Sequence, residues 1–297
     1  MKFLRKIIIV SLPILAISCA KPIANFTYKT PEGTQAPSAI VFENTSQKAE
    51  AYEWNFGDGK SSTEVKPIHR YTSSGIYNIK LKAIKGSKSN TYEQKIIIEA
   101  PKECTVELET EFGSMTIELF NDTPLHRDNF IKLAEQGFYD GTIFHRVING
   151  FMVQGGDPNS KDAGENTQLG GGDTNYTIPA EFVDTLAHIK GMLCAARTGD
   201  NVNPKKRSSG SQFYIVHGRP VDDKTLDYLE SVKGFHYTKE QRRAYKEMGG
   251  TPNLDKEYTV FGRVVKGLDV IDKIANVDTE PGDRPKKNVK MKVIAIR

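Results

Sequence analysis

The sequence predicts a mainly β protein with two folded domains, a small antiparallel sandwich followed by an antiparallel barrel with helices at its ends. The chain of 297 residues is longer than one typical domain. Short runs of alternating apolar and polar residues, separated by turn residues, recur through its first third. Similar runs then flank two stretches of helical periodicity and one long charged insertion.

Composition narrows the class of protein. Hydrophobic residues make up 38% and charged residues 26% of the chain, as in ordinary soluble proteins. The net charge of +4 is small for this length, and the sequence has no dense basic stripe, so we expect no nucleic-acid partner.

The N-terminus has the pattern of a signal peptide over residues 1–18. Lys2, Arg5 and Lys6 precede an apolar stretch that is too short to span a bilayer as a helix. These features predict export of the protein.

The stretch ends in AISC (residues 16–19), which resembles a bacterial lipobox, although Ala16 stands where leucine is commoner. The resemblance implies cleavage before Cys19 and lipidation of its thiol and new amine. Ordinary secretory cleavage near Ser18 is the alternative. We expect a membrane-anchored lipoprotein of the bacterial cell envelope, on the periplasmic face, and the sequence leaves the choice of membrane open.

The two remaining cysteines, Cys104 and Cys194, lie in apolar, strand-like runs. Two buried thiols and a disulfide both fit an exported protein. The chain has neither a CxxC pair nor an HExxH motif, so the sequence predicts no metal site.

The first predicted domain covers residues 22–100. Trp54 lies between Tyr52 and Phe56 in one alternating run, so one face of that strand should bury three aromatic rings. Helical periodicity does not interrupt these runs, which favours an all-β sandwich. The expected strands cover residues 38–43, 51–56, 76–83 and 94–99.

Three motifs of this domain resemble the PKD domain, an immunoglobulin-like sandwich of extracellular bacterial proteins. They are YEWNFGDG (52–59), PIHRY (67–71) and GIY (75–77). The resemblance implies a spacer, or a module that binds protein or glycan, and no catalysis. We interpret Asp58 as a turn-forming residue, with calcium binding as the alternative, and His69 as a packing residue.

The second predicted domain covers residues 104–297 and begins with a hairpin, because alternating runs flank the turn at Phe112 and Gly113. A helix should end at Gly137, since apolar residues before it recur at helical spacing. Strands that surround two helices favour a capped antiparallel barrel. The expected strands cover residues 105–109, 114–120, 192–196, 212–216 and 259–265, and the expected helices cover 124–136 and 268–275.

The most informative stretch is FHRVI (144–148), followed at once by GFMVQGGD (150–157). It places an arginine beside large apolar residues and a neutral amide, which suits a site that holds an apolar ring and hydrogen-bonds the amide attached to it. A proline and the peptide bond before it have this chemistry. We expect the guanidinium of Arg146 to be buried and His145 to be a structural, hydrogen-bonded histidine.

The sequence offers little support for other chemistries. It has no GxSxG motif, and GGGD (170–173) lacks the Lys-Ser/Thr pair of a phosphate-binding loop, so we interpret it as a turn. A nucleophile or metal mechanism is therefore not predicted, and we expect no cofactor.

Five ordered motifs in this domain resemble the cyclophilins, the cyclosporin-binding family of peptidyl-prolyl isomerases. Besides the two above, they are YTIPAEF (176–182), GSQFYI (210–215) and YTVFG (258–262). The resemblance implies an eight-stranded antiparallel barrel with two capping helices, and proline-containing polypeptides as substrates.

The resemblance also implies roles for individual residues. Arg146 matches the catalytic arginine, and Gln154 matches the amide that holds the substrate backbone. Ala196 and Gln212 match residues of the peptide groove. The pocket for the proline ring matches Phe151, Met152, Tyr214 and Leu254, with tyrosine in place of the more usual phenylalanine at Tyr214.

Three positions depart from the family pattern. Asn253 stands where the family has an indole that contacts cyclosporin, so we predict weak binding of this drug. Arg197 and Tyr258 replace the usual asparagine and histidine and should change the polarity of the groove. Because all three lie outside the catalytic arginine and the ring pocket, we expect turnover to survive.

Residues 222–250 form the charged insertion, which should border the groove because it lies between the strand of Gln212 and the loop of Leu254. A helix over residues 238–248 is expected to begin at Thr238. Extension of the substrate surface, contact with a partner and simple solvation all fit this segment.

The sequence thus predicts an isomerase that assists the folding of exported or envelope proteins by a non-covalent mechanism. The alternative is a cyclophilin-like binding module or holdase chaperone without turnover.

Overall fold

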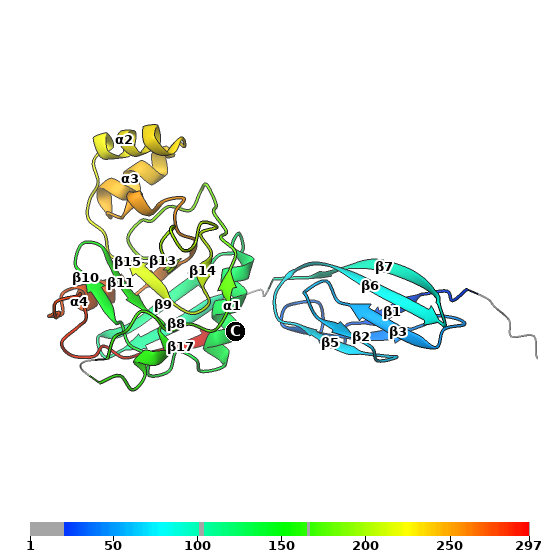
Figure 1. Ribbon diagram of the computed structural model, residues 1–297. Helices are drawn as coiled ribbons and strands as arrows, with labels where there is room; N and C mark the ends of the chain where they lie inside the picture. The colour runs from blue at the N-terminus through cyan, green and yellow to red at the C-terminus, as the bar shows by residue number, and fades with distance from the viewer. Residues whose placement is uncertain (1–20, 101–103, 165–166, 297) are drawn as a thin grey trace, which may run out of the picture. The chain divides into compact units, whose positions relative to one another are not determined.

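The computed structural model describes residues 21–100, 104–164 and 167–296, and the chain divides into two compact units (Figure 1). Most residues before Ile97 form the first unit, and Ile97–Arg297 belong to the second. The predicted signal peptide and Cys19 lie outside the described residues. Within the described ranges, no helix is long and apolar enough to cross a membrane.

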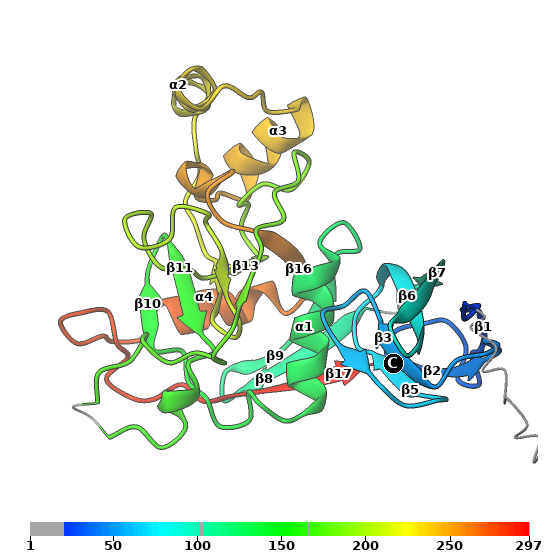
Figure 2. The same cartoon turned by 45° about the vertical axis from the view of Figure 1, so that its right-hand side comes forward.

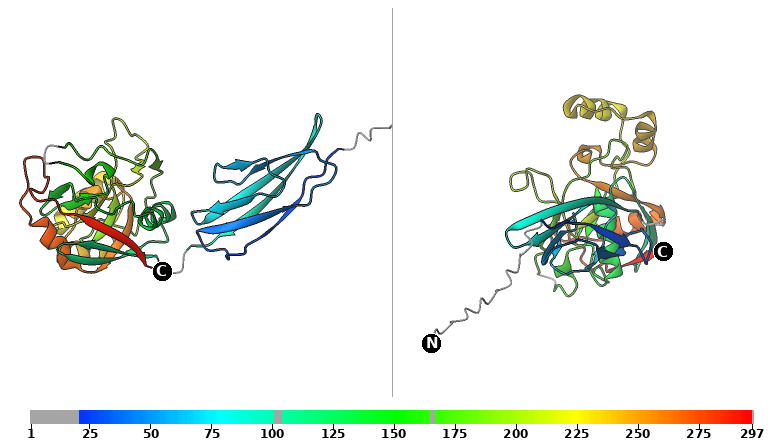
Figure 3. Two further views of the ribbon diagram at one scale, coloured as in Figure 1. Left: turned by 90° about the horizontal axis from the view of Figure 1, so that it is seen from below. Right: turned by 90° about the vertical axis from the view of Figure 1, so that its right-hand side faces the viewer.

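The first unit is a sandwich of two sheets, as predicted (Figure 3). The sheets have strand orders β1-β2-β5 and β4-β3-β6-β7. The bounds are β1 Phe26–Lys29, β2 Ser38–Asn44, β3 Ala51–Asn55, β4 Ser61–Ser62, β5 Ile68–Tyr71, β6 Gly75–Lys85 and β7 Lys88–Ile98.

The core of the sandwich is built around Trp54, which is 1% exposed. Its ring centroid lies 5.2 Å from that of Phe26 and 5.3 Å from that of Phe42. Phe56 is buried as well. Tyr52 is only half-buried near the start of β3, so the expectation of three buried rings on this strand is wrong for Tyr52.

The sequence does not predict β1, β4 or β5, and it predicts only the last part of β7. The first seven residues of β7, KSNTYEQ, are mostly exposed on both faces, so they show no apolar alternation. Hydrogen bonding to β6, rather than a buried face, defines this half of the strand.

Asp58 and His69 act together in the structure. Asp58 Oδ1 accepts the backbone N–H of Lys60 (3.0 Å), as in a turn, and Asp58 Oδ2 lies 2.8 Å from His69 Nε2. The His69 ring stacks on Phe56 with 4.1 Å between centroids. Both residues therefore have the structural roles that the sequence favours.

The second unit is an eight-stranded antiparallel sheet that curls into a barrel-like shape, with strand order β10-β11-β15-β13-β16-β9-β8-β17 (Figure 2). Two hydrogen bonds join the segment before β10 to the start of β17: the N–H of Met291 donates to the carbonyl oxygen of Thr142, and the N–H of Gly141 donates to that of Met291. The bounds are β8 Thr105–Thr110, β9 Gly113–Leu119, β10 Arg146–Ile148, β11 Met152–Gly155, β13 Met192–Ala195, β15 Phe213–Val216, β16 Val260–Lys266 and β17 Met291–Ile296. A small separate sheet pairs β12 (Thr177–Ile178) with β14 (Ser208–Ser209).

Two helices pack on this sheet, as predicted: α1 (Pro124–Glu135) and α4 (Leu268–Ala275). The first turn of α1 is capped from a distance, because the Glu181 carboxylate accepts the backbone N–H groups of Leu125 and His126 (each 3.0 Å). An anion at a helix N-terminus satisfies unpaired N–H groups and complements the helix dipole. The glutamate of the YTIPAEF motif thus fixes α1.

The insertion folds into two helices, α2 (Asp223–Lys233) and α3 (Lys239–Glu247), which stand at one end of the second unit (Figures 1 and 2). The predicted helix α3 is confirmed. Its capping box joins Thr238 and Gln241, each side chain accepting the other's backbone N–H. The sequence does not predict α2, because Leu226 is its only buried residue and no apolar stripe marks it.

Cys104 and Cys194 are both buried, and no disulfide joins them in the described part of the chain. Of the two interpretations that the sequence leaves open, the structure supports buried thiols. Burial raises the pKa of both groups, which keeps them protonated and unreactive at neutral pH.

Candidate active-site groove

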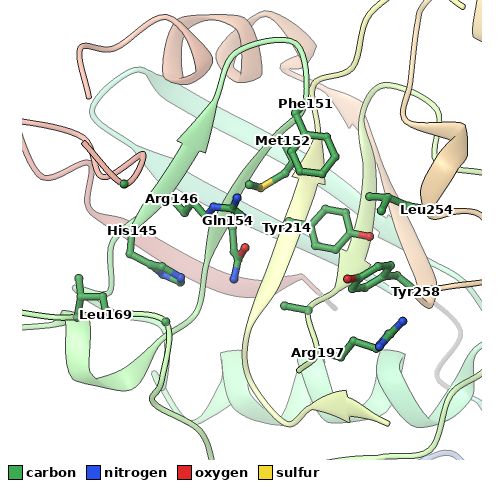
Figure 4. A pocket seen from close by; sticks show the side chains of 13 residues that line it. His145, Arg146, Phe151, Met152, Gln154, Leu169, Arg197, Tyr214, Leu254 and Tyr258 are labelled. Atoms are coloured by element: carbon green, nitrogen blue, oxygen red, sulfur yellow. The ribbon is translucent and has the colours of Figure 1, made fainter. Parts of the chain in front are cut away.

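A cavity of about 270 Å³ lies on the second unit where β10, β11, β15 and the short η2 helix (Pro252–Leu254) come together (Figure 4). Its lining combines cationic, amide and apolar side chains. The lining residues are His145, Arg146, Phe151, Met152, Gln154, Leu169, Gly170, Ala196, Arg197, Tyr214, Leu254, Tyr258 and Gly282.

Antiparallel pairing brings the polar and apolar parts of the cavity together. Arg146 on β10 is paired with Gln154 on β11, and Gln154 is paired with Tyr214 on β15. Directly paired residues of neighbouring strands point to the same face of a sheet. The arginine, the amide and the pocket tyrosine therefore form a row across three strands.

The structure places seven of the eight predicted site residues in this lining, and their individual roles stay predictions. The seven are Arg146, Phe151, Met152, Gln154, Ala196, Tyr214 and Leu254. The eighth, Gln212, is buried beside the cavity. Sequence reasoning does not identify Leu169, Gly170 or Gly282 as lining residues. Gly170 belongs to GGGD, which the sequence indicates only as a turn, and the other two lie in loops without a recognisable motif.

The prediction that Arg146 is buried is wrong. Its side chain is 44% exposed, and its Nε donates to Asp283 Oδ2 at 3.2 Å. β10 is an end strand of the sheet, so no further strand of the sheet covers the guanidinium on that side. An ion pair this exposed contributes only about 0–1 kcal/mol to stability. The contact with Asp283 therefore orients the Arg146 side chain without holding it tightly, and the guanidinium stays accessible to a substrate.

The apolar part of the cavity has a buried floor and half-buried walls. Met152 and Tyr214 are buried, while Phe151, Leu254 and Tyr258 are partly buried around them. The rings of Tyr214 and Tyr258 meet edge to face, with 5.8 Å between centroids. The expectation that Tyr258 lies outside the ring pocket is therefore wrong. This arrangement leaves an apolar hollow that suits a small ring such as that of proline.

The extra hydroxyl of Tyr214, relative to the usual phenylalanine, is satisfied inside the protein. Its Oη lies 3.0 Å from Nε2 of His188, and both side chains are buried. A buried hydroxyl without a partner would be unfavourable. The tyrosine therefore presents its ring, and not an unpaired polar group, to the cavity.

Gln212 supports Gln154 from behind. Gln154 Nε2 donates to Gln212 Oε1 (3.3 Å), and Gln212 Nε2 donates to the carbonyl oxygens of Gly170 (3.0 Å) and Gly172 (2.6 Å). Gln212 thus links the amide in the cavity to the glycine-rich loop that forms one wall.

The glycine-rich loop binds a carboxylate of the protein itself. The backbone N–H groups of Gly170 (2.6 Å) and Gly172 (3.2 Å) donate to Oδ2 of Asp157, which is fully buried. A Cβ added at Gly172 would lie 2.0 Å from Asp157 Oδ1, so the loop requires glycine there. GGGD is thus a loop without regular secondary structure, with a bend at Gly170, and its N–H groups bind a carboxylate of the protein.

His145 differs from the prediction of a hydrogen-bonded histidine. The residue is 6% exposed and lines the cavity, but neither ring nitrogen has a hydrogen-bond partner among the described residues. Burial lowers the pKa of His145 to about 4, so the ring is neutral at pH 7. It contributes a neutral, polar ring beside Arg146.

Arg197 and Tyr258 form one wall of the groove. The Arg197 side chain is 4% exposed, and its guanidinium stacks over the Tyr258 ring at 4.5 Å from the centroid. The same guanidinium forms ion pairs with Asp200 and Glu257. Its charge is therefore neutralised within the wall, so the two substitutions change the shape of the groove more than its charge. Asn253 is exposed and lies outside the lining.

The curled antiparallel sheet carries a groove in which an apolar hollow lies beside an arginine and an amide. Residues 105–296 match the family model of the cyclophilin type peptidyl-prolyl cis-trans isomerases, and residues 19–99 match that of the PKD domain. The chain therefore belongs to the cyclophilin-type peptidyl-prolyl cis-trans isomerases and also carries a PKD domain.

The second unit is similar to the following proteins and solved structure. A protein of Staphylococcus aureus (strain USA300) named as a peptidyl-prolyl cis-trans isomerase is 37% identical over 195 residues, which cover 65% of this chain and 92% of the relative. A protein of Streptococcus pyogenes, named as a bifunctional phosphatase/peptidyl-prolyl cis-trans isomerase, is 39% identical over 196 residues; the match covers 64% of this chain and 38% of that longer protein. A crystal structure of a cyclophilin type isomerase of Cryptosporidium parvum covers 66% of this chain and 98% of its own, at 24% identity and a TM-score of 0.49.

Proposed function

We propose that this chain accelerates cis–trans isomerisation of X–Pro bonds in exported or envelope proteins, by a non-covalent mechanism in the groove described above. The row of Arg146, Gln154 and Tyr214 carries this proposal, because it sets a cationic donor and an amide beside a ring-sized apolar hollow. Membership of the isomerase family supports the reaction and the substrate class.

Rotation about an X–Pro bond is slow because amide resonance must be lost, at a barrier of about 18–20 kcal/mol. At the transition state the proline nitrogen becomes pyramidal and gains a lone pair. Arg146 is proposed to donate a hydrogen bond to this nitrogen, which then resists return to the planar amide. This interaction is stronger in the transition state than in the ground state, as catalysis requires.

The hydrogen bond from Arg146 accounts for only part of the acceleration. A rate gain of about 10⁵ requires about 7 kcal/mol, and one donor to a developing charge contributes about 2–4 kcal/mol. The remainder is assigned to the apolar hollow and Gln154, which hold one half of the peptide while the other half rotates. No bond to the protein forms and no proton is transferred, so the proposed reaction requires no cofactor.

The test is isomerisation of an X–Pro tetrapeptide by protein that begins at Ala20. Arg146→Ala should lower kcat/KM by about 10²–10³-fold. Arg263→Ala is the matched control, because Arg263 is also an exposed strand residue with a carboxylate partner, Glu118 at 2.8 Å. Equal activity in the two variants would remove Arg146 from the mechanism.

The absence of wild-type turnover across several X residues would favour the binding module or holdase. In that case the wild type and Arg146→Ala should suppress aggregation of an unfolded client equally well, which light scattering would show.

We propose a lipid anchor at Cys19 from the sequence, since an apolar stretch leads into AISC. Acylation places the mature protein on an envelope membrane, where several acyl chains anchor it stably. The test is the intact mass of protein extracted from membranes, with Cys19→Ser as control. Cleavage near Ser18 with an unmodified thiol would contradict the proposal.

We propose that the PKD domain is a spacer that also binds protein, because its family model matches residues 19–99 and such domains mediate protein interactions. Glycan binding is the competing idea. Sedimentation of the soluble protein with purified cell-wall glycan would favour the glycan and overturn the proposal.

A further inference from the structure

A buried chain of hydrogen bonds begins at the floor of the cavity. Tyr214 Oη lies 3.0 Å from His188 Nε2, and His188 Nδ1 lies 2.8 Å from Asp255 Oδ1. His188 is 0% and Asp255 is 3% exposed. A carboxylate can only accept hydrogen bonds, so Nδ1 of His188 is the donor to Asp255, and Nε2 is paired with the hydroxyl group of Tyr214.

The chain of hydrogen bonds continues from Asp255 into the α2–α3 insertion. Asp255 Oδ1 also accepts the backbone N–H of His188 (2.8 Å), and Oδ2 accepts the hydroxyl groups of Tyr237 (2.8 Å) and Tyr245 (2.6 Å). Tyr245 lies in α3, and Tyr237 directly precedes its N-cap. Burial raises the pKa of both tyrosines, so both remain protonated donors at neutral pH.

The insertion also holds the backbone that carries a wall of the cavity. Lys233, in the last turn of α2, donates from Nζ to the carbonyl oxygens of Asn253 and Asp255 (each 2.7 Å). Leu254 lies between these two residues in the chain and lines the cavity. Figure 4 shows the hydroxyl of Tyr214 on the side of the cavity where Leu254 lies.

Apolar side chains pack around this chain of hydrogen bonds. Leu226 of α2 and Tyr245 of α3 are 0% exposed and form one buried cluster with Ala187 and Ile189, the neighbours of His188. Loss of a donor would therefore leave a carboxylate incompletely satisfied in a site that water does not readily reach, and such networks are costly when half satisfied. The arrangement at Asp255 thus fixes Tyr214 and Leu254 together.

We propose that residues 222–250 are a positioning element of the proline pocket, and that Tyr237 and Tyr245 act through Asp255 and His188 on the ring of Tyr214 and on the loop of Leu254. Neither tyrosine is expected to touch the substrate. The inference rests on the proposed function, since it assigns a role in isomerisation at this groove.

The effect of removing the hydroxyl groups of Tyr237 and Tyr245 follows from the role of the pocket in holding the proline ring. The floor and the Leu254 wall hold the proline ring in both the ground state and the transition state, so a loosened pocket should raise KM more than it lowers kcat. A pocket with less fixed walls should also discriminate less sharply between rings of different size. Arg146→Ala, in contrast, should act on kcat.

The experiment uses soluble protein that begins at Ala20 and carries Tyr237→Phe together with Tyr245→Phe. The substrates are a prolyl peptide and the same peptide with the six-membered pipecolyl ring. KM for the prolyl peptide should rise about fivefold or more with kcat within about twofold, and the prolyl-to-pipecolyl ratio of kcat/KM should fall. Tyr228→Phe is the control, because Tyr228 lies on α2 and is 66% exposed.

The outcomes separate the inference from the proposed function. An active wild type with unchanged KM and ring preference in the folded double variant overturns the inference alone. If the double variant fails to fold, the two single variants are measured instead, since each keeps one donor on Asp255 Oδ2. Unchanged ring preference in both single variants overturns the inference. The absence of wild-type turnover overturns the proposed function, and the inference with it.

Discussion

Replacement of Asp157 by asparagine should destabilise the second unit and loosen one wall of the groove. The buried carboxylate accepts three backbone N–H bonds, from Asn159 (2.8 Å), Gly170 (2.6 Å) and Gly172 (3.2 Å). Asparagine keeps one acceptor oxygen, so in either orientation of the amide at least one backbone N–H faces an NH₂ group.

The magnitude follows from these bonds. A hydrogen bond to a charged group contributes about 1.5–3 kcal/mol to stability and a neutral one about 0.5–1.5 kcal/mol. If the amide oxygen keeps both glycine bonds, the bond from Asn159 is lost and the other two weaken by about 1 kcal/mol each, for a total of about 3.5–5 kcal/mol. In a domain of this size, that corresponds to a fall in Tm of about 7–20 °C.

Thermal unfolding followed by near-ultraviolet circular dichroism measures this loss. Asp173→Asn is the control, because Asp173 lies in the same loop and accepts N–H bonds from Thr174 (2.7 Å) and Gly210 (3.0 Å), but is exposed to water. It should cost about 1 kcal/mol or less. KM should rise in Asp157→Asn, since Gly170 lines the cavity. A Tm within about 2 °C of the control would refute the reasoning.

Two further predictions concern pH and drug binding. Burial lowers the pKa of His145 from 6.5 to about 4. As the pH falls, the unfolded chain therefore binds a proton at His145 before the folded chain does. The free energy of unfolding should fall by up to about 3 kcal/mol between pH 6.5 and 4 and level off below pH 4. Urea unfolding at pH 7 and 4.5 checks this, and His145→Gln should lose that part of the pH dependence. The same change in the free energy of unfolding between the two pH values in wild type and variant would contradict the prediction. Cyclosporin should inhibit isomerisation weakly, and Asn253→Trp should strengthen inhibition by about tenfold or more; nanomolar inhibition of the wild type would show that the indole is not needed.

Much of the fold can be predicted because its signals are local. Alternation identifies the β8–β9 hairpin, and the apolar face of α1 and its end at Gly137 mark that helix. Strands without a buried face give no such signal, as the polar first half of β7 shows. The helix α2 is missed for the same reason, because it buries Leu226 and almost nothing else.

The candidate site is predictable for a different reason. Its residues lie in short motifs on strands that pair directly, so Arg146, Gln154 and Tyr214 become neighbours through the register of β10, β11 and β15. The partner of Arg146 is not predictable in this way. Asp283 comes from a distant turn, and only the folded chain places it 3.2 Å from the guanidinium.

The solvent exposure of individual side chains is the property that the sequence motifs predict least well. A motif specifies the side chain of Arg146 but not its place on an end strand, which leaves it 44% exposed. His145 shows the opposite case, since the fold buries it without a hydrogen-bond partner among the described residues. Burial depends on what packs over a residue, and that packing comes from other parts of the chain.

The sequence by itself determined the two-domain, mainly β architecture, the resemblance to two families and the residue types of the groove. These depend on local periodicity and on motifs of a few residues. The tertiary structure alone decided that Gln212 stands behind Gln154, that GGGD surrounds Asp157, and that a chain of buried hydrogen bonds joins Tyr214 to the α2–α3 insertion. Each of these contacts joins residues at least ten positions apart in sequence. A hydrogen bond between such residues depends on distances that only the folded chain sets.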